Sequence, residues 1–131
     1  MSFEQSVRKI ITNYDLVLLV TFGSYKTERF TDRSDIDIGY VPRAPLDARK
    51  KLGLLGDLVL LFKRDRIDLV DLSRANPLLL YEVACNSHVL YEEDDSYLKF
   101  KLRASARYAD TKFLRQQRKE YLNSLIREIG E

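Results

Sequence analysis

The first third of the chain contains one amphipathic segment followed by two short segments of different pattern. Ser2 and Gln5 form a capping-box pattern ahead of apolar residues at helical spacing, which predicts a helix over Phe3–Asn13. Leu16–Phe22 is short, apolar and partly β-branched, so we expect a buried strand with apolar residues on both faces. Asp35–Val41 alternates polar and apolar residues, which is typical of a half-buried strand.

The middle of the chain predicts a second helix and a third strand. Leu46–Phe62 has apolar residues at helical spacing, although Gly53 and Gly56 are weak helix formers. The apolar residues that indicate this helix are Leu52, Leu55, Val59 and Leu60. Arg66–Leu72 is again short and largely apolar, and we expect it to be a strand.

A short helix and an edge strand are expected next. Asn76 followed by Pro77 is typical of a helix start, and this helix should run to about Cys85. Asn86 is expected to take the left-handed conformation that often ends a helix. We interpret the cysteine as a small buried side chain. His88–Tyr91 predicts an edge strand that begins with the chain's only histidine, at the surface.

The last part of the chain predicts one long helix, because the stretch from Asp94 to Ile129 contains neither Pro nor Gly. A first apolar stripe consists of Leu98, Leu102, Ala106, Ala109 and Phe113. A second apolar set consists of Leu122, Leu125, Ile126 and Ile129. A helix of this length extends roughly 50 Å, which exceeds a small domain. We therefore expect its end to pack on a partner protein or on a second copy of the chain.

Charge is uneven along the chain. Residues 99–131 hold nine Lys and Arg against four Asp and Glu, whereas the whole chain has a net charge of only +2. A solvated helix face explains this excess simply. The alternative is a docking surface for an acidic partner or for RNA.

These elements predict an α/β (α+β) fold with a small mixed sheet flanked by helices. The 131 residues suit a single domain, 1–131, with a core over about 15–92 and a C-terminal helix over about 94–129. The small net charge does not favour direct nucleic-acid binding. No apolar run approaches the roughly 20 residues of a membrane helix. With one cysteine and no signal-peptide pattern, we expect a cytoplasmic protein.

The stretch from Gly23 to Asp37 contains the residues best suited to chemistry. Gly23 and Ser24 follow directly on the first predicted strand. A glycine allows the backbone to approach a phosphate closely, and a serine adds a hydroxyl donor. A short helix over Tyr25–Phe30 would direct its N-terminal amides at the same anion.

Two carboxylates, Asp35 and Asp37, follow ten residues after this Gly-Ser pair. Residues two apart on a strand point to the same face, so both side chains are expected to lie together. Carboxylate oxygens are the ligands that hard divalent cations prefer. Such cations neutralise charge in phosphoryl transfer, so the pattern predicts a metal-dependent phosphoryl-transfer site.

This combination resembles the nucleotidyltransferase superfamily that includes DNA polymerase β, whose hallmark is Gly-Ser, a spacer of about ten residues and Asp-x-Asp. The superfamily adds a third carboxylate on a neighbouring strand, often after a basic and an apolar residue. Arg66 and Ile67 precede Asp68 in this way, which favours it over Asp71. Because the two aspartates are three apart on a strand, only one of them can face the site.

Within the superfamily, the small size is similar to minimal nucleotidyltransferase (MNT) domains, the MntA-type antitoxins of HEPN/MNT toxin–antitoxin systems. The resemblance implies a protein adenylyltransferase that transfers AMP from ATP to a tyrosine hydroxyl of a HEPN-domain toxin ribonuclease. It implies two Mg²⁺ ions held by Asp35, Asp37 and Asp68, and a nucleotide bound by Gly23 and Ser24. It further implies an antitoxin, with the C-terminal helix available for homo- or hetero-oligomers.

The loop departs from the family pattern at two positions. Lys26 stands where a small residue is usual, and Glu28 stands where a second glycine is usual. The lysine suits a triphosphate, whereas the glutamate would repel one unless it faced solvent. Two other functions therefore stay open: an antitoxin that neutralises by binding alone, and a nucleotidyltransferase for a small molecule such as an aminoglycoside.

Overall fold

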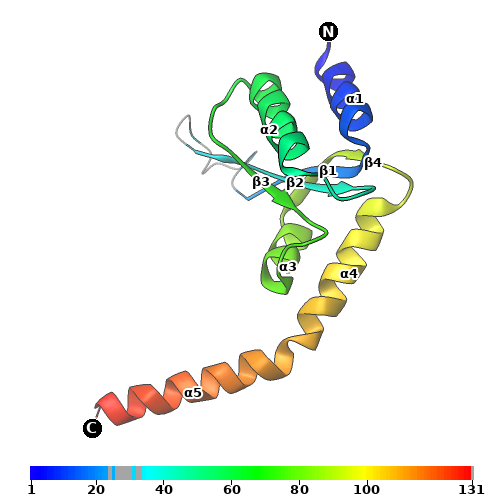
Figure 1. The fold of residues 1–131 in the computed structure, drawn as a ribbon. Helices are drawn as coiled ribbons and strands as arrows, with labels where there is room; N and C mark the ends of the chain where they lie inside the picture. Colours follow the sequence, from blue (N-terminus) through cyan, green and yellow to red (C-terminus); the bar gives the residue numbers. More distant parts are fainter. Residues whose placement is uncertain (24, 26–30, 32–33, 131) are drawn as a thin grey trace.

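The computed structural model describes residues 1–23, 25, 31 and 34–130, and Figure 1 shows their arrangement around one small sheet. Helices cover both faces of this sheet, and the last helix leads away from it. In chain order the elements are α1 (Phe3–Tyr14), β1 (Leu16–Phe22), β2 (Ile36–Pro42), α2 (Ala48–Phe62), β3 (Ile67–Asp71), α3 (Pro77–Cys85), β4 (Ser87–Glu92), α4 (Ser96–Asp110) and α5 (Lys112–Gly130). The predicted mixed α/β fold is therefore confirmed.

The sheet has the strand order β3-β2-β1-β4 and combines both kinds of pairing. β1 runs antiparallel to β2 and to β4, whereas β2 and β3 are parallel. A parallel pair needs a crossover connection, which α2 provides. As a result, β2 and β3 begin at the same edge of the sheet, and the residues at their starts become neighbours.

Two apolar cores lie on opposite faces of the sheet, which explains why β1 is apolar throughout. One core lies under α1 and α2 and includes Leu16 and Leu19 of β1. The other lies under α3 and α4 and includes Leu18, Val20 and Phe22 of β1. A strand covered on both sides needs apolar residues on both sides, so the prediction for Leu16–Phe22 is confirmed.

The N-terminal helix begins as its sequence predicts. Ser2 Oγ accepts a hydrogen bond from the Gln5 backbone N–H at 3.2 Å, and Gln5 Oε1 accepts one from the Ser2 N–H at 3.0 Å. This reciprocal capping box satisfies two amides that have no partner within the helix. Val7, Ile10 and Ile11 are buried against the sheet.

The predicted helix is present as α2, but the leucines that it buries fully are not among the residues that indicated it. Leu54 and Leu58 are fully buried, whereas Leu52 is 71% exposed and Leu60 is 77% exposed. Between Leu52 and Phe62 the helix is apolar on most of its sides, so periodicity does not identify one face. The position of the helix on the sheet decides which leucines are covered.

The C-terminal helix is not continuous, in contrast to the prediction. It breaks at Thr111, whose backbone N–H and Oγ1 both donate to the Tyr108 carbonyl, at 3.1 and 2.7 Å. This bond spans three residues instead of four and therefore ends the α-helical ladder. The predicted stripe is also wrong, because Phe100 and Ala104 are buried whereas Leu98 and Leu102 are exposed.

The region around α3 and β4 agrees with the sequence in part. Asn76 caps α3 by accepting from the Leu79 N–H at 2.9 Å, and β4 is an edge strand, as predicted. Asn86, however, has φ −136° and is not left-handed, and Cys85 is exposed instead of buried. The helix expected over Tyr25–Phe30 falls largely outside the described residues. None of the helices in the described part of the chain is both long and apolar enough to cross a membrane.

Substitutions in α2 test the observed core face. Leu54→Ala removes a fully buried side chain and should lower the free energy of unfolding by ~2–5 kcal/mol. Leu52→Ala, two residues earlier and 71% exposed, should change it by less than about 0.5 kcal/mol. Chemical denaturation of both variants measures this difference. Equal losses, or a larger loss for Leu52→Ala, would contradict the observed orientation of the helix.

Candidate active site

The parallel pairing of β2 and β3 brings two of the predicted carboxylates together. Asp37 and Asp68 are direct partners in the register of these strands. The side chains on this face of β2 point toward α3 and α4, since Gly39, two residues after Asp37, faces Leu72 of that core. Two carboxylates from neighbouring strands therefore lie side by side at one edge of the sheet.

Asp35 joins this pair from the chain that leads into β2. It lies one residue before the strand and is exposed. A cavity of about 490 Å³ is lined by Asp35 and Asp68 together with Asp65, Arg66 and Ile67. Asp35 and Asp68 thus border the same hollow at the start of β3.

Burial and neighbouring negative charge both act on Asp37. Partial burial raises its pKa above 3.8, and the carboxylates of Asp68, Asp35 and Glu82 raise it further. A cluster of carboxylates at this edge favours a proton or a cation in its midst. Sequence reasoning missed Glu82, which comes from α3. Nothing in the sequence indicates it, because only the packing of α3 over the sheet brings it near Asp37.

Asp71 lies on the opposite face of the sheet from Asp68, as strand alternation predicted. Its Oδ1 accepts from the Ser73 N–H at 3.0 Å and from the Ser73 hydroxyl. Its carboxylate also contributes, after burial, to raising the pKa of Tyr40, which belongs to the core under α1 and α2. Asp71 therefore does not take part in the carboxylate group.

Gly23 is required for the close approach of Asp37. Its φ is +73°, a conformation that L side chains rarely adopt, and a Cβ at this position would collide with Asp37 Oδ2. The turn after β1 therefore passes directly over the carboxylate. Ser24, the other predicted nucleotide-binding residue, lies outside the described residues, as do Lys26 and Glu28.

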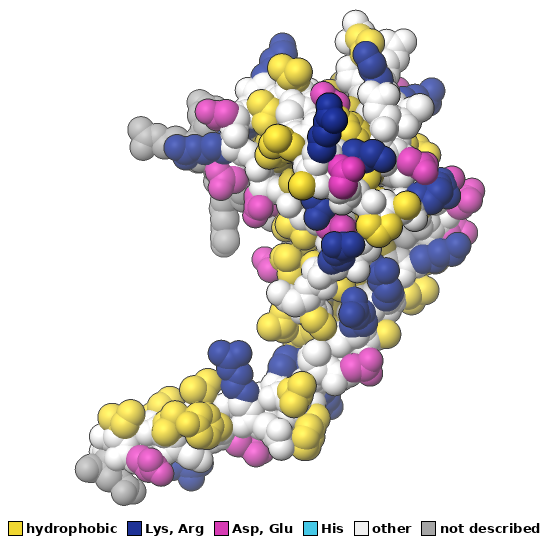
Figure 2. All heavy atoms as spheres, viewed as in Figure 1, with side chains coloured by type: hydrophobic (Ala, Val, Ile, Leu, Met, Phe, Trp, Pro, Cys, Tyr) yellow, Lys and Arg dark blue, Asp and Glu magenta, His cyan; other side chains and the backbone are white. Residues whose placement is uncertain are grey.

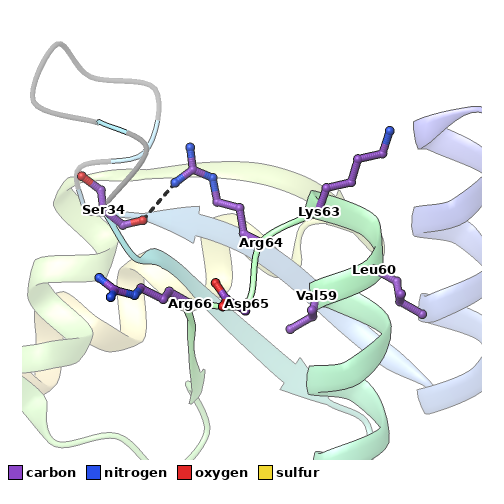
Figure 3. Close-up of a pocket in the computed structure, with 7 residues that line it drawn as sticks. All are labelled: Ser34, Val59, Leu60, Lys63, Arg64, Asp65 and Arg66. Atoms are coloured by element: carbon purple, nitrogen blue, oxygen red, sulfur yellow. Dashed lines mark hydrogen bonds between the residues drawn. The ribbon is translucent and has the colours of Figure 1, made fainter.

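Arg64, which sequence reasoning also missed, ties down the chain ahead of Asp35. Its Nη1 donates to the carbonyls of Thr31 and Ser34, both at 3.1 Å, and Figure 3 shows the side chain reaching toward Ser34. The surrounding cavity of about 810 Å³ shares Asp65 and Arg66 with the carboxylate cavity. Arg64 thus fixes the backbone from which Asp35 projects.

The donor set is suited to Mg²⁺. Within the described residues, no three Asp, Glu, His or Cys side chains surround one point closely enough to hold an ion by themselves. Mg²⁺ in phosphoryl-transfer sites, however, typically takes one or two carboxylates and completes its shell with substrate phosphates and water. Asp37 and Asp68, which are adjacent in the strand register, supply the two carboxylates that this requires.

The comparisons with known proteins agree with this geometry. The model of the family described as "Polymerase beta, Nucleotidyltransferase" matches residues 5–96, which include all four strands and every predicted site residue. The chain belongs to this nucleotidyltransferase family. The resemblance to the polymerase β-like nucleotidyltransferases is thereby confirmed.

Relatives match the nucleotidyltransferase over nearly its full length. Protein adenylyltransferase MntA of Aphanizomenon flos-aquae (strain 2012/KM1/D3) is 29% identical over 138 residues, covering 97% of this chain and 91% of the relative. A chain in a toxin–antitoxin crystal structure with AMP-PNP has a TM-score of 0.73 at 24% identity, covering 94% and 98% of the two chains.

A chain in the complex of tri-AMPylated Shewanella oneidensis HEPN toxin with MNT antitoxin has a TM-score of 0.69 at 24% identity, covering 95% and 96%. At such identities, these two structures show that the fold is shared. The coverage includes the C-terminal helices as well as the sheet.

Replacement of Asp37 tests the electrostatics of the carboxylate group. Because the folded state raises the pKa of Asp37, stability due to this group is lost as the pH rises from about 3.8 through the folded pKa. Asp37→Asn should therefore melt at a higher temperature than the parent at pH 7 without Mg²⁺. Mg²⁺ at about 100 times its Kd should stabilise the parent by about 2.7 kcal/mol and the variant by less. Identical melting curves with Mg²⁺ and with EDTA would contradict a metal site here.

Two glycine-to-alanine substitutions test the turn over Asp37. Gly23→Ala should destabilise the protein by about 1–2 kcal/mol from the positive φ alone, and further because the new Cβ displaces the carboxylate. Gly56→Ala is the matched control, since a Cβ there meets nothing within 4 Å and lies in a helix. That variant should gain roughly 0.5–1 kcal/mol. Urea denaturation measures both, and a Gly23→Ala variant as stable as the parent would refute the close approach.

Proposed function

We propose that this nucleotidyltransferase transfers AMP from ATP to a tyrosine hydroxyl of a cognate HEPN-type toxin and thereby acts as its antitoxin. The observation that carries the proposal is the pairing of Asp37 with Asp68 at the edge of the sheet, in a chain of which 97% aligns with a protein adenylyltransferase. A single cysteine and an intracellular toxin as partner favour the cytoplasm as the place of the reaction.

The carboxylates supply the metal ligands in this proposal. Asp35, Asp37 and Asp68 would hold Mg²⁺, which neutralises charge on the phosphates and lowers the pKa of the attacking hydroxyl when bound. Glu82 adds negative charge near Asp37 and strengthens the preference of the carboxylate group for cations. Arg64 keeps the chain that bears Asp35 in place through the carbonyls of Thr31 and Ser34.

The remaining residues bind the nucleotide and receive the proton. Gly23 and Ser24 would bind the β- and γ-phosphates, because the glycine leaves the backbone accessible. The hydroxyl oxygen of the acceptor forms a bond to the α-phosphorus while the bond to pyrophosphate breaks. Asp68 would accept the proton of that hydroxyl, which is supported by its position in the lining of the cavity that Asp35 also lines.

Two substitutions within one strand test this assignment. Asp68→Asn should slow transfer at least a thousandfold, because it removes a metal ligand and the proton acceptor. Asp71→Asn, three residues later on the opposite face, should leave transfer nearly unchanged, since its Oδ1 still accepts from Ser73. The measurement is the intact mass of the cognate HEPN-type toxin after incubation with ATP and Mg²⁺, with each AMP adding about 329 Da.

The same measurement separates the alternatives. If Asp35→Asn combined with Asp37→Asn modifies the partner as well as the parent does, the catalytic assignment is wrong. If the parent neutralises the toxin without adding mass, the protein is an antitoxin that acts by binding alone. Transfer of AMP to an aminoglycoside, with none to the protein, would identify a small-molecule enzyme.

A further inference from the structure

The last helix, α5, presents an apolar surface that nothing in the described chain covers. None of its 19 residues is buried, and Figures 1 and 2 show it projecting from the body with hydrophobic side chains gathered along it. Six large apolar residues of this helix are 47–84% exposed, and all of them except Phe113 lie, with the half-buried Leu125, within about half of its circumference. We call these residues the α5 stripe: Leu114, Tyr121, Leu122, Leu125, Ile126 and Ile129.

Such a helix requires a partner for its stability. In proteins, helices are stabilised mainly by packing of an amphipathic face, and no residue of α5 is buried against the described chain. Contiguous apolar surface on a monomer usually marks an interaction site. The α5 stripe has the apolar positions, three and four residues apart, through which one helix packs on another.

The direction of α5 is determined by a side-chain clamp at the break with α4. The Arg115 guanidinium lies over the Tyr108 ring at 3.8 Å, and its Nη1 donates to the Tyr108 hydroxyl at 2.9 Å. On its other side the Tyr108 ring stacks on Tyr81 of α3 at 3.9 Å. Arg115 Nε also donates to Thr111 Oγ1 at 2.9 Å. The clamp connects three helices, so the stripe is held at a defined angle to the sheet.

The charge of α5 indicates which occupant it accepts. The helix has five basic residues, Lys112, Arg115, Arg118, Lys119 and Arg127, and two acidic ones, Glu120 and Glu128. Pairing with a second copy would bring together two helices that each have a net charge of +3, and like charges at an interface oppose association. An acidic helix avoids this repulsion and also gains from the flanking cations.

We propose that the α5 stripe is the docking site for an acidic amphipathic helix of a partner protein. This proposal rests on the proposed function in that the partner is the protein that accepts AMP. Binding through α5 places the contact outside the carboxylate cavity, so docking and transfer use different residues of this chain.

Binding measurements with the full chain test the surface without relying on transfer. The probe is the cognate HEPN-type toxin of the proposed function, titrated calorimetrically without ATP. Leu122→Glu and Ile126→Glu should each weaken binding about 30-fold or more, as expected for central apolar interface residues. Asn123→Glu is the matched control outside the α5 stripe on the same helix and should bind within about threefold of the parent. Circular dichroism confirms that each variant is folded.

Charge and self-association provide two further readouts. Lys119→Glu should weaken binding at low salt and less so at 0.5 M NaCl, where charges are screened. Unchanged affinity in both stripe variants would overturn the proposal. So would a dimer of the chain alone, in analytical ultracentrifugation, that Leu122→Glu converts to a monomer. Docking through α5 without any added AMP mass would instead overturn the proposed function and leave the docking surface in place.

Discussion

The parallel pairing of β2 and β3 is the constraint on which the site depends. It aligns Asp37 with Asp68, and it requires that both strands begin at the same edge of the sheet. A shift of one residue in this register would turn Asp68 toward the core under α1 and α2, away from Asp37. The crossover helix α2, seated through Leu54 and Leu58, maintains the register from the other face. The alignment of the carboxylates on one face of the sheet thus depends on the apolar packing of α2 on the other face.

Like charges held close together oppose folding unless something compensates for them. Asp37 shares its surroundings with Asp68, Asp35 and Glu82, and burial adds to the effect of their charge. The fold tolerates this group because the sheet and the Arg64 hydrogen bonds hold the backbone, and because Gly23 leaves room for the carboxylate. Such a group favours a proton or a cation among its carboxylates.

In the proposed function, the carboxylate group and α5 have separate roles, which are AMP transfer and partner binding. The sheet edge holds the carboxylates, whereas α5 has no buried residue and lies beyond the clamp formed by Arg115 and Tyr108. A break at Thr111 in place of a continuous helix gives α5 a direction of its own. Substitutions on α5 can therefore change binding without disturbing the carboxylates, and substitutions at the carboxylates can change chemistry without disturbing α5.

The sequence by itself determined the features that depend on neighbouring residues: the capping box at Ser2, the N-cap at Asn76, the strands, and the Gly-Ser and Asp-x-Asp pattern that identified the family. It also placed Asp68 and Asp71 on opposite faces, since alternation along a strand is local. Tertiary packing decided the rest. Contacts between distant segments determine which leucines of α2 are buried and where the last helix breaks. They also determine that Glu82 lies near Asp37. The spacing of apolar residues predicts that a helix has an apolar side, but it does not predict which other segment will cover that side.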